Sequence, residues 1–129
     1  MVNVIITSNP RYKINRDCIQ TSITTVFSAH KVTGNVEIEV TIVGDRKMQT
    51  LNKKYRKIDG TTDVLSFCLT EGNEMGFITI PDGILRLGLI VISYPQVIIN
   101  ASADKKSVED EINFLVEHGI THLLGIHHD

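Results

Sequence analysis

The sequence is poor in aromatic residues, has two cysteines and contains no long hydrophobic run. It has no tryptophan, three tyrosines and four phenylalanines, so it offers few rings on which bases could stack. Cys18 and Cys68 form no C-x2-C pair, and we expect both to be free thiols in a reducing compartment. No apolar stretch approaches the roughly 20 residues of a transmembrane helix, and the first residues lack the features of a signal peptide. These absences predict a soluble cytoplasmic protein without a membrane partner.

Charge of neither sign dominates the chain. Its 13 lysines and arginines against 15 aspartates and glutamates give a net charge of -2 at pH 7. A polyanion would therefore have to be held by a local basic patch and not by the surface as a whole. A chain of 129 residues with 42% hydrophobic content can bury a core without disulfides. We predict that residues 1–129 form a single domain.

Hydrophobic periodicity predicts strands and helices in alternation. We expect Asp45 to cap the second helix and Ser107 to open the last one, and we expect Asp63 and Ser66 to have structural roles. The strand over residues 87–94 is almost wholly apolar, so it should be central and covered on both faces. This order predicts an α+β layered domain with a mixed sheet of four or five strands and a C-terminal histidine helix lying across it. The remaining strands are expected at 2–7, 36–42, 61–69 and, as a short hairpin arm, 77–80, and the helices at 15–30, 46–55, 96–103 and from 107 onward.

Four of the five histidines lie in the last twelve residues, HGITHLLGIHHD. His118 and His122 are four apart, so they lie one above the other on the same face of a helix, where two imidazoles can share a metal ion. Gly125 can end the helix in a left-handed conformation, which lets the chain turn back and offer His128 to the same ion. Three histidines with one open position are typical of catalytic zinc, although imidazoles also suit nickel, copper or iron. The spacing predicts a metal-dependent hydrolase with a zincin-like site and one Zn(2+) ion per chain.

The last helix carries its apolar residues on one face, which ends close to the histidines. Val108, Ile112 and Val116 follow helical spacing. We therefore expect His118 and His122, which continue near that face, to point inward over the core and not into water.

The residue after the first histidine separates this pattern from that of a metallopeptidase. Peptidases of the HExxH kind carry the glutamate general base there, whereas this chain has Gly119. Glu117 precedes the histidine and points roughly 100° away around the helix. A phosphodiester instead needs a cation and an arginine to balance the charge of its transition state. Arg56 fits that role, its alternative being a surface ion pair with Asp59, and a metallopeptidase remains the weaker alternative function.

The predicted helix over residues 46–55 places basic side chains outside its apolar face. On its own this pattern is typical of a solvated helix, and the alternative is a basic face for a phosphate backbone. Single-stranded RNA is favoured over a duplex, because a chain with so few aromatic rings has little with which to pry paired bases apart. The basic residues are Arg46, Lys47, Lys53, Lys54 and Lys57.

Two segments resemble the signatures of one known family. Residues 51–67, LNKKYRKIDGTTDVLSF, are similar to the N-terminal signature of the YbeY family, and residues 118–128, HGITHLLGIHH, are similar to its histidine motif. The resemblance implies a metal-dependent endoribonuclease, specific for single strands, that acts in ribosomal RNA maturation and ribosome quality control. The implied partners are single-stranded ribosomal RNA and the ribosome or its proteins. The implied site residues are His118, His122 and His128 as metal ligands, with His118 also counted as catalytic, and Arg56 as the basic residue of the active cleft.

The sequence departs from the family pattern at several positions. His127 stands where the family usually has aspartate, so His127 or His128 could be the third ligand, and we choose His128 by register. Thr121 replaces a leucine, and Leu89 replaces a carboxylate in the usual Gly-Asp-Ile strand. The sequence stops at Asp129, which would leave the third ligand near a free end. These departures keep a second alternative open, a non-catalytic, metal-stabilised protein that binds RNA or the ribosome.

Overall fold

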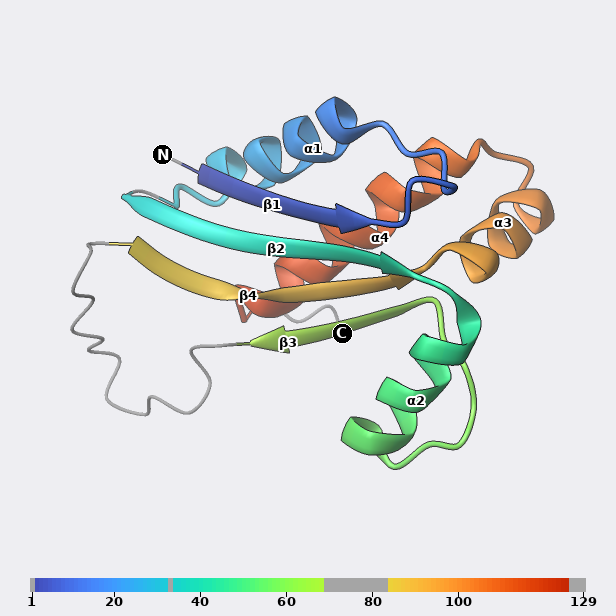
Figure 1. Ribbon diagram of the computed structural model, residues 1–129. Helices are drawn as coiled ribbons and strands as arrows, with labels where there is room; N and C mark the ends of the chain where they lie inside the picture. Colours follow the sequence, from blue (N-terminus) through green and yellow to red (C-terminus); the bar gives the residue numbers. More distant parts are fainter. Residues whose placement is uncertain (1, 33, 69–83, 126–129) are drawn as a thin grey trace.

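The computed structural model describes residues 2–32, 34–68 and 84–125, in which strands and helices alternate (Figure 1). The elements have the types that the periodicity predicts, and the α+β class is confirmed. The hairpin arm expected over 77–80 lies outside the described residues, as do His127 and His128. The elements are β1 (Val2–Ser8), α1 (Arg16–Ala29), β2 (Asn35–Val43), α2 (Asp45–Arg56), β3 (Val64–Cys68), β4 (Ile84–Ser93), α3 (Tyr94–Ala103) and α4 (Val108–Leu123).

The described strands form one mixed, four-stranded sheet in the order β1-β2-β4-β3. β1, β2 and β4 are parallel, whereas β3 is antiparallel to β4 and lies at the edge. β4 is inserted between β2 and β3, so it is central, as its apolar composition predicts. Three consecutive residues of β4, Ile90, Val91 and Ile92, are 0%, 2% and 0% exposed, which confirms that both faces of this strand are covered.

Helices cover the two faces of the sheet unequally (Figure 1). α1 and α4 pack on one face and build the larger core cluster with residues such as Ile23, Val40, Ile90 and Val116. α2 covers only the β3 end of the other face, where Met48 packs on residues of β3 and β4. Within the described ranges, no helix has both the length and the apolar character needed to cross a membrane.

The first turn of α2 is held by a carboxylate that reaches out of the helix. The N-cap is Gly44, without a side-chain cap bond, so the prediction that Asp45 caps this helix was wrong. Asp45 instead accepts hydrogen bonds from Ser93 Oγ at 2.8 Å, Thr61 Oγ1 at 2.9 Å and Gln96 Nε2 at 3.1 Å. Burial alone would raise the pKa of the Asp45 carboxyl, but these hydrogen bonds outweigh it and hold the pKa below its ordinary value.

The limits of α4 follow the predicted signals. Ser107 is the N-cap, and its side chain accepts a hydrogen bond from the Asp110 N–H at 3.0 Å. Acidic residues in the first turn suit the positive end of the helix dipole. At the other end, Gly125 has a φ of 79°, and its N–H donates to the His122 carbonyl at 3.0 Å. The helix therefore ends where the glycine signal predicts.

We predict that Asp45→Asn lowers the free energy of unfolding by about 1–2 kcal/mol at pH 7, because hydrogen bonds to a charged acceptor are lost. A carboxyl whose folded pKa is depressed contributes stability that is fully present above its unfolded pKa of about 3.9. That contribution is lost as the pH falls through the lower folded pKa. Urea unfolding at pH 7 and near pH 2 measures both values, with Asp17→Asn, an exposed carboxylate of α1, as the control. An equal loss for Asp45→Asn at both pH values would contradict this assignment.

Candidate active site

Two glycines allow α4 to lie close to the sheet. A Cβ built on Gly119 would lie 3.0 Å from Ile90 Cδ1, and a Cβ on Gly88 would lie 3.0 Å from Leu123 Cδ1 and overlap the Phe67 carbonyl oxygen. Side chains at either position would force the helix away from β4, since packed interiors do not absorb added methyl groups freely. The close approach positions the C-terminal half of α4 beside β4 and β3.

His118 and His122 lie at the border of the buried stripe of α4. Gly119 and Leu123, the residues that follow them, are buried, whereas both histidines are exposed. The prediction that they point inward over the core was therefore wrong, because one residue along a helix is a rotation of about 100°. The two imidazoles share a helix face, as their spacing predicts, and both are open to the same pocket.

That pocket has a volume of about 500 Å³ and brings together three elements that are distant in sequence. α4 contributes the histidines, β3 contributes four consecutive residues, and the last turn of α2 contributes an aromatic and a basic side chain. Arg56 is thus on the same pocket as both histidines, as proposed from the sequence. The lining residues are Tyr55, Arg56, Val64, Leu65, Ser66, Phe67, His118 and His122.

Arg56 is exposed on the pocket. The alternative ion pair with Asp59 is not formed among the described residues, where Asp59 instead accepts a hydrogen bond from Gln49 Nε2 at 3.3 Å. The guanidinium is therefore available to an anion entering the pocket.

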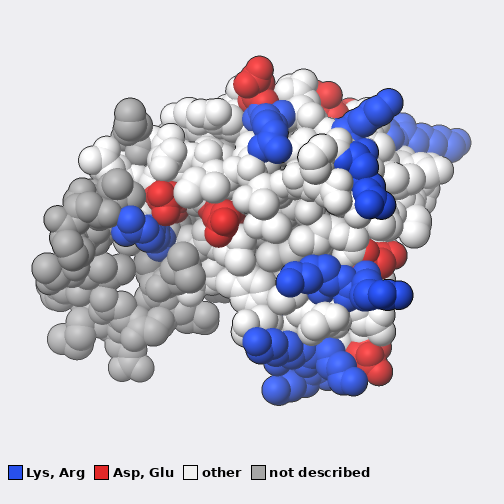
Figure 2. All heavy atoms as spheres, viewed as in Figure 1, with Lys and Arg blue, Asp and Glu red and all other residues white. Residues whose placement is uncertain are grey.

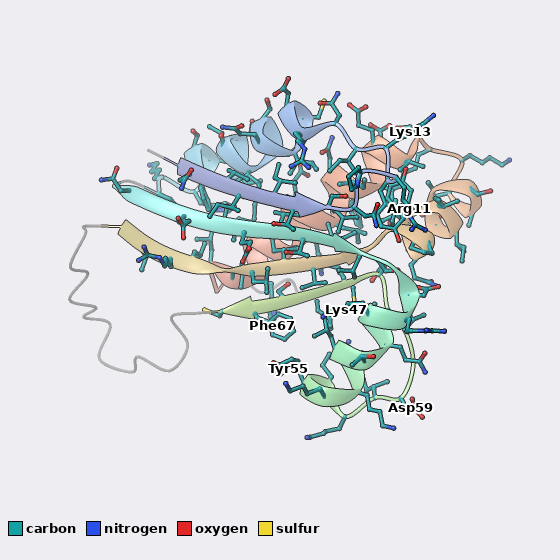
Figure 3. The ribbon with its side chains drawn as sticks, viewed as in Figure 1. Arg11, Lys13, Lys47, Tyr55, Asp59 and Phe67 are labelled. Carbon is teal, nitrogen blue, oxygen red and sulfur yellow. The ribbon has the colours of Figure 1, made fainter. Side chains whose placement is uncertain are left out.

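Two exposed aromatic rings lie near the histidines, and the sequence patterns predicted a functional role for neither of them. Tyr55 is 54% exposed and lies edge-to-face with Phe67, at 5.0 Å between ring centroids, and Figure 3 shows their side chains pointing toward each other. Phe114 is 55% exposed and its ring centroid lies 6.3 Å from that of His118, on the preceding turn of α4. The position of Tyr55 next to Arg56 in the sequence was the signal that could have identified Tyr55 as a pocket residue.

A basic surface extends along α2 from the pocket. Lysine and arginine side chains gather over this helix, at the lower right of Figure 2. A shallow hollow of about 420 Å³ lies among them, lined by Arg46, Lys53, Lys54 and Asp59 together with two polar residues. The local basic patch that the overall charge requires for a polyanion is therefore present, on the helix that ends in Arg56.

The histidine pair offers a partial donor set for a metal ion. No group of three or more His, Cys, Asp or Glu residues able to hold a metal is found in the part of the chain that the structure describes. The third predicted ligand, His128, and its alternative His127 lie outside that part. Two exposed imidazoles four residues apart suit a borderline-soft divalent ion such as zinc, and the donors present fit such an ion.

The position of a peptidase base is occupied by the sheet. Because a Cβ at position 119 would already lie 3.0 Å from Ile90 Cδ1, a glutamate side chain at this position would be driven against β4. Glu117 is exposed and lines a different hollow, with Phe114, His118 and Thr121. Among the described residues, no carboxylate lines the pocket that both histidines share. This arrangement counts against a metallopeptidase.

Leu89 does not line the pocket. It pairs with Phe67 across the two strands and packs in the smaller core cluster with Met48, Leu65 and Val91. Leucine in place of the family's carboxylate at position 89 is therefore accommodated by apolar packing beneath α2.

The family model described as Endoribonuclease YbeY matches residues 5–129 of the chain. The chain belongs to the YbeY family. Endoribonuclease YbeY of Dehalococcoides mccartyi is 36% identical over 133 residues, which cover 98% of this chain and 77% of that protein. Endoribonuclease YbeY of Oceanobacillus iheyensis is 42% identical over 105 residues, 79% of this chain and 68% of that protein. These matches confirm the resemblance seen in residues 51–67 and 118–128.

Structural comparison supports the fold. The solution structure of TM1509 from Thermotoga maritima is similar to the whole of this chain and to 75% of its own, with a TM-score of 0.58 and 25% sequence identity. The mixed sheet and its helices are thus a fold already observed in a solved structure.

We predict that Gly119→Glu, which completes an HExxH sequence, destabilises the protein and creates no peptidase. The variant must place a side chain where Ile90 now packs and bring a carboxylate toward an apolar core, so the free energy of unfolding should fall by at least about 2 kcal/mol. Chemical denaturation and digestion of a peptide library measure the two effects. The control is Glu117→Gln, at an exposed position two residues before Gly119. Its free energy of unfolding should stay within about 0.5 kcal/mol of the wild-type value. A stable Gly119→Glu variant that cleaves peptides would refute this interpretation.

Proposed function

We propose that this chain is a zinc-dependent endoribonuclease that cleaves single-stranded RNA in ribosomal RNA maturation and ribosome quality control. Membership of the Endoribonuclease YbeY family makes the chain a hydrolytic endoribonuclease and supports a role in ribosomal RNA maturation. The observation that carries the rest of the proposal is that one pocket brings His118, His122 and Arg56 together. Ribosomal RNA, and with it the ribosome or its proteins, are the proposed partners.

The proposed metal ligands are His118, His122 and His128, which would hold one ion per chain. Zinc is our choice because three imidazoles with one open position are the donor set of catalytic zinc sites. When bound, the ion would supply a Lewis acid that lowers the pKa of water to about 7 and offsets the charge of a phosphodiester. The exposure of His118 and His122 on the pocket supports access of both metal and substrate.

Arg56 is proposed to bind the scissile phosphate. Its planar guanidinium can donate to two phosphate oxygens at once, and no ion pair with Asp59 competes for it among the described residues. The arginine would orient the phosphodiester over the histidines and balance the negative charge that grows as the bond to the leaving oxygen breaks. Hydrolysis adds water across the phosphorus–oxygen bond, so it needs no oxidant, and water is its only co-substrate.

The basic face of α2 is proposed to hold the RNA on either side of the reacting phosphate. Arg46, Lys53 and Lys54 border the hollow next to the pocket, where each phosphate contact would release counterions and make binding sensitive to salt. A chain with a net charge of -2 needs such a local surface to attract RNA, and α2 leads from it directly to Arg56.

One observation favours the rival function, a non-catalytic, metal-stabilised protein that binds RNA or the ribosome. No Asp or Glu among the described residues lines the shared pocket, so no carboxylate there can take a proton from the attacking water. The rival predicts metal and RNA binding without cleavage, whereas the enzyme needs all three.

We predict that His122→Ala loses the metal and reduces RNA cleavage by at least about 100-fold, because charge stabilisation in the transition state is lost. The fold and RNA binding should persist, since His122 is exposed. Elemental analysis, cleavage of a labelled single strand and fluorescence anisotropy measure the three properties. His30→Ala, an exposed histidine at the C-cap of α1, is the matched control and should behave as wild type. Full metal content in His122→Ala would refute the ligand assignment, and RNA binding without cleavage by the zinc-loaded wild type would establish the rival.

We predict that Arg56→Lys keeps RNA affinity within a few-fold but reduces kcat by roughly 100-fold, because a lysine retains the charge and loses the two-pronged donor. Single-turnover cleavage at saturating protein measures this separately from binding. Lys53→Ala, a basic residue of the same helix that lines the other hollow, should instead weaken binding and its salt dependence, with little change in kcat. An Arg56→Lys variant with wild-type kcat would exclude the proposed role.

A further inference from the structure

The pocket that holds the histidines runs along the outer edge of β3. In the sheet formed by the described strands, β3 is the last strand and pairs with β4 alone. Residues 64–67, four in a row, line the pocket. Because successive side chains of a strand point to opposite faces of the sheet, a pocket that touches four consecutive residues meets the strand at its backbone edge.

The hydrogen bonding of β3 identifies which backbone groups face the pocket. The Ser93 N–H donates to the Asp63 carbonyl at 2.9 Å, and Val64 pairs with Ile92 in the antiparallel ladder. Residues that bond to the partner strand alternate with residues whose groups point away. The carbonyl of Val64 and the N–H of Ser66 therefore point out of the sheet, and neither has a backbone partner among the described residues.

A nucleobase matches this pair of groups. The Watson–Crick edge of each of the four bases carries a hydrogen-bond donor next to an acceptor, and proteins that recognise single-stranded RNA bind such edges directly. We propose that the outer edge of β3 hydrogen-bonds the Watson–Crick edge of an unpaired base beside the scissile phosphate, with the Val64 carbonyl accepting and the Ser66 N–H donating. This inference rests on the proposed function and names how its substrate is selected.

Selection for single strands follows from the geometry. In a duplex the Watson–Crick edge is already bonded to the opposite base, so a paired base cannot reach the strand edge. All four bases offer a donor beside an acceptor in one orientation or the other, so the edge of β3 distinguishes unpaired from paired RNA without selecting a particular base.

An exposed ring stands on the same pocket to support the base. Tyr55 is 54% exposed, is positioned by its edge-to-face contact with Phe67, and has Lys54 Nζ at 5.1 Å from its ring centroid (Figure 3). Stacking of a base on an aromatic side chain contributes about 1–3 kcal/mol and tolerates any sequence. Tyr55 would hold the base by its face while β3 binds its edge.

An extended peptide could also add to a free strand edge. The charges around the pocket favour RNA, because Arg56 lines it and the basic face of α2 borders it. A peptide ligand is therefore treated as an outcome of the test.

The test combines a change in the protein with a change in the RNA. Ser66→Pro removes the outward N–H, and proline is tolerated on an edge strand where that N–H does not face the partner. Ser66→Ala keeps the N–H and removes only the hydroxyl, so it is the matched control. Oligonucleotides carry one N6,N6-dimethyladenine, which lacks the donor of the Watson–Crick edge, at each position in turn. Binding is measured by anisotropy on residues 1–129 carrying His122→Ala, which prevents cleavage. Cleavage is measured on the zinc-loaded protein without that change.

We expect dimethylation at one position next to the cleaved bond to weaken binding and cleavage by about tenfold, the scale of one lost base-edge contact. Ser66→Pro should bind unmodified RNA about tenfold more weakly and should respond less to dimethylation, because a base that has lost its bond to residue 66 no longer lies against the Val64 carbonyl. Ser66→Ala should respond as wild type does. Circular dichroism confirms that the proline variant is folded, and the dimethylation series on the wild type stands even if that variant does not fold.

Three results would overturn the proposal. One is wild-type binding and cleavage that ignore dimethylation at every position. Another is a folded Ser66→Pro variant that discriminates as the wild type does. The third is binding of a strand-forming peptide in the pocket that single-stranded RNA does not inhibit. If RNA is cleaved equally well with and without dimethylation, this inference is rejected and the ribonuclease function stands. If unmodified RNA is not cleaved at all, the proposed function itself is rejected.

Discussion

The structure depends on the close contact between α4 and the sheet. Gly119 on the helix and Gly88 on β4 leave little room for a further methyl group between the two layers. This contact has one consequence for stability, the burial of Ile90, Ile120 and their neighbours in the main core, and another for function. It brings the C-terminal half of the helix to the edge of the sheet, where the exposed imidazoles of His118 and His122 share a pocket with β3.

Polar contacts fix the two walls of the pocket relative to each other. Asn100 Nδ2 donates to Asp63 Oδ2 at 3.2 Å and to Glu111 Oε2 at 3.4 Å, so one amide of α3 joins the start of β3 to α4. Glu111 is 3% exposed and forms an ion pair with Lys106 at 2.7 Å. Most buried polar groups in proteins have hydrogen-bond partners, and here the partners of Asn100 connect the strand with the helix that carries His118. Side-chain hydrogen bonds thus connect the elements that carry the site, although the histidines themselves are exposed.

Local patterns in the sequence predicted the elements and the histidine pair, because helix and strand periodicity and capping are short-range effects. The strand expected at residues 36–42 and the Ser107 cap of α4 are examples. The Asp45 cap was wrong because its carboxylate bonds to residues distant in the chain, which no local signal encodes. The edge position of β3 depends on the insertion of β4 between β2 and β3, and this also is a long-range property. The isolated glycines at 88 and 119 were a usable signal, since a glycine inside a strand or helix often marks a close approach.

We propose that His118 and His122 of α4, together with His128, bind one zinc ion through three imidazoles. X-ray absorption fine structure at the zinc edge of the loaded protein tests this most directly. We expect three imidazole nitrogens at about 2.0–2.1 Å and one further light-atom ligand. A sulfur ligand at about 2.3 Å, or fewer than three imidazoles in the fitted spectrum, would contradict it.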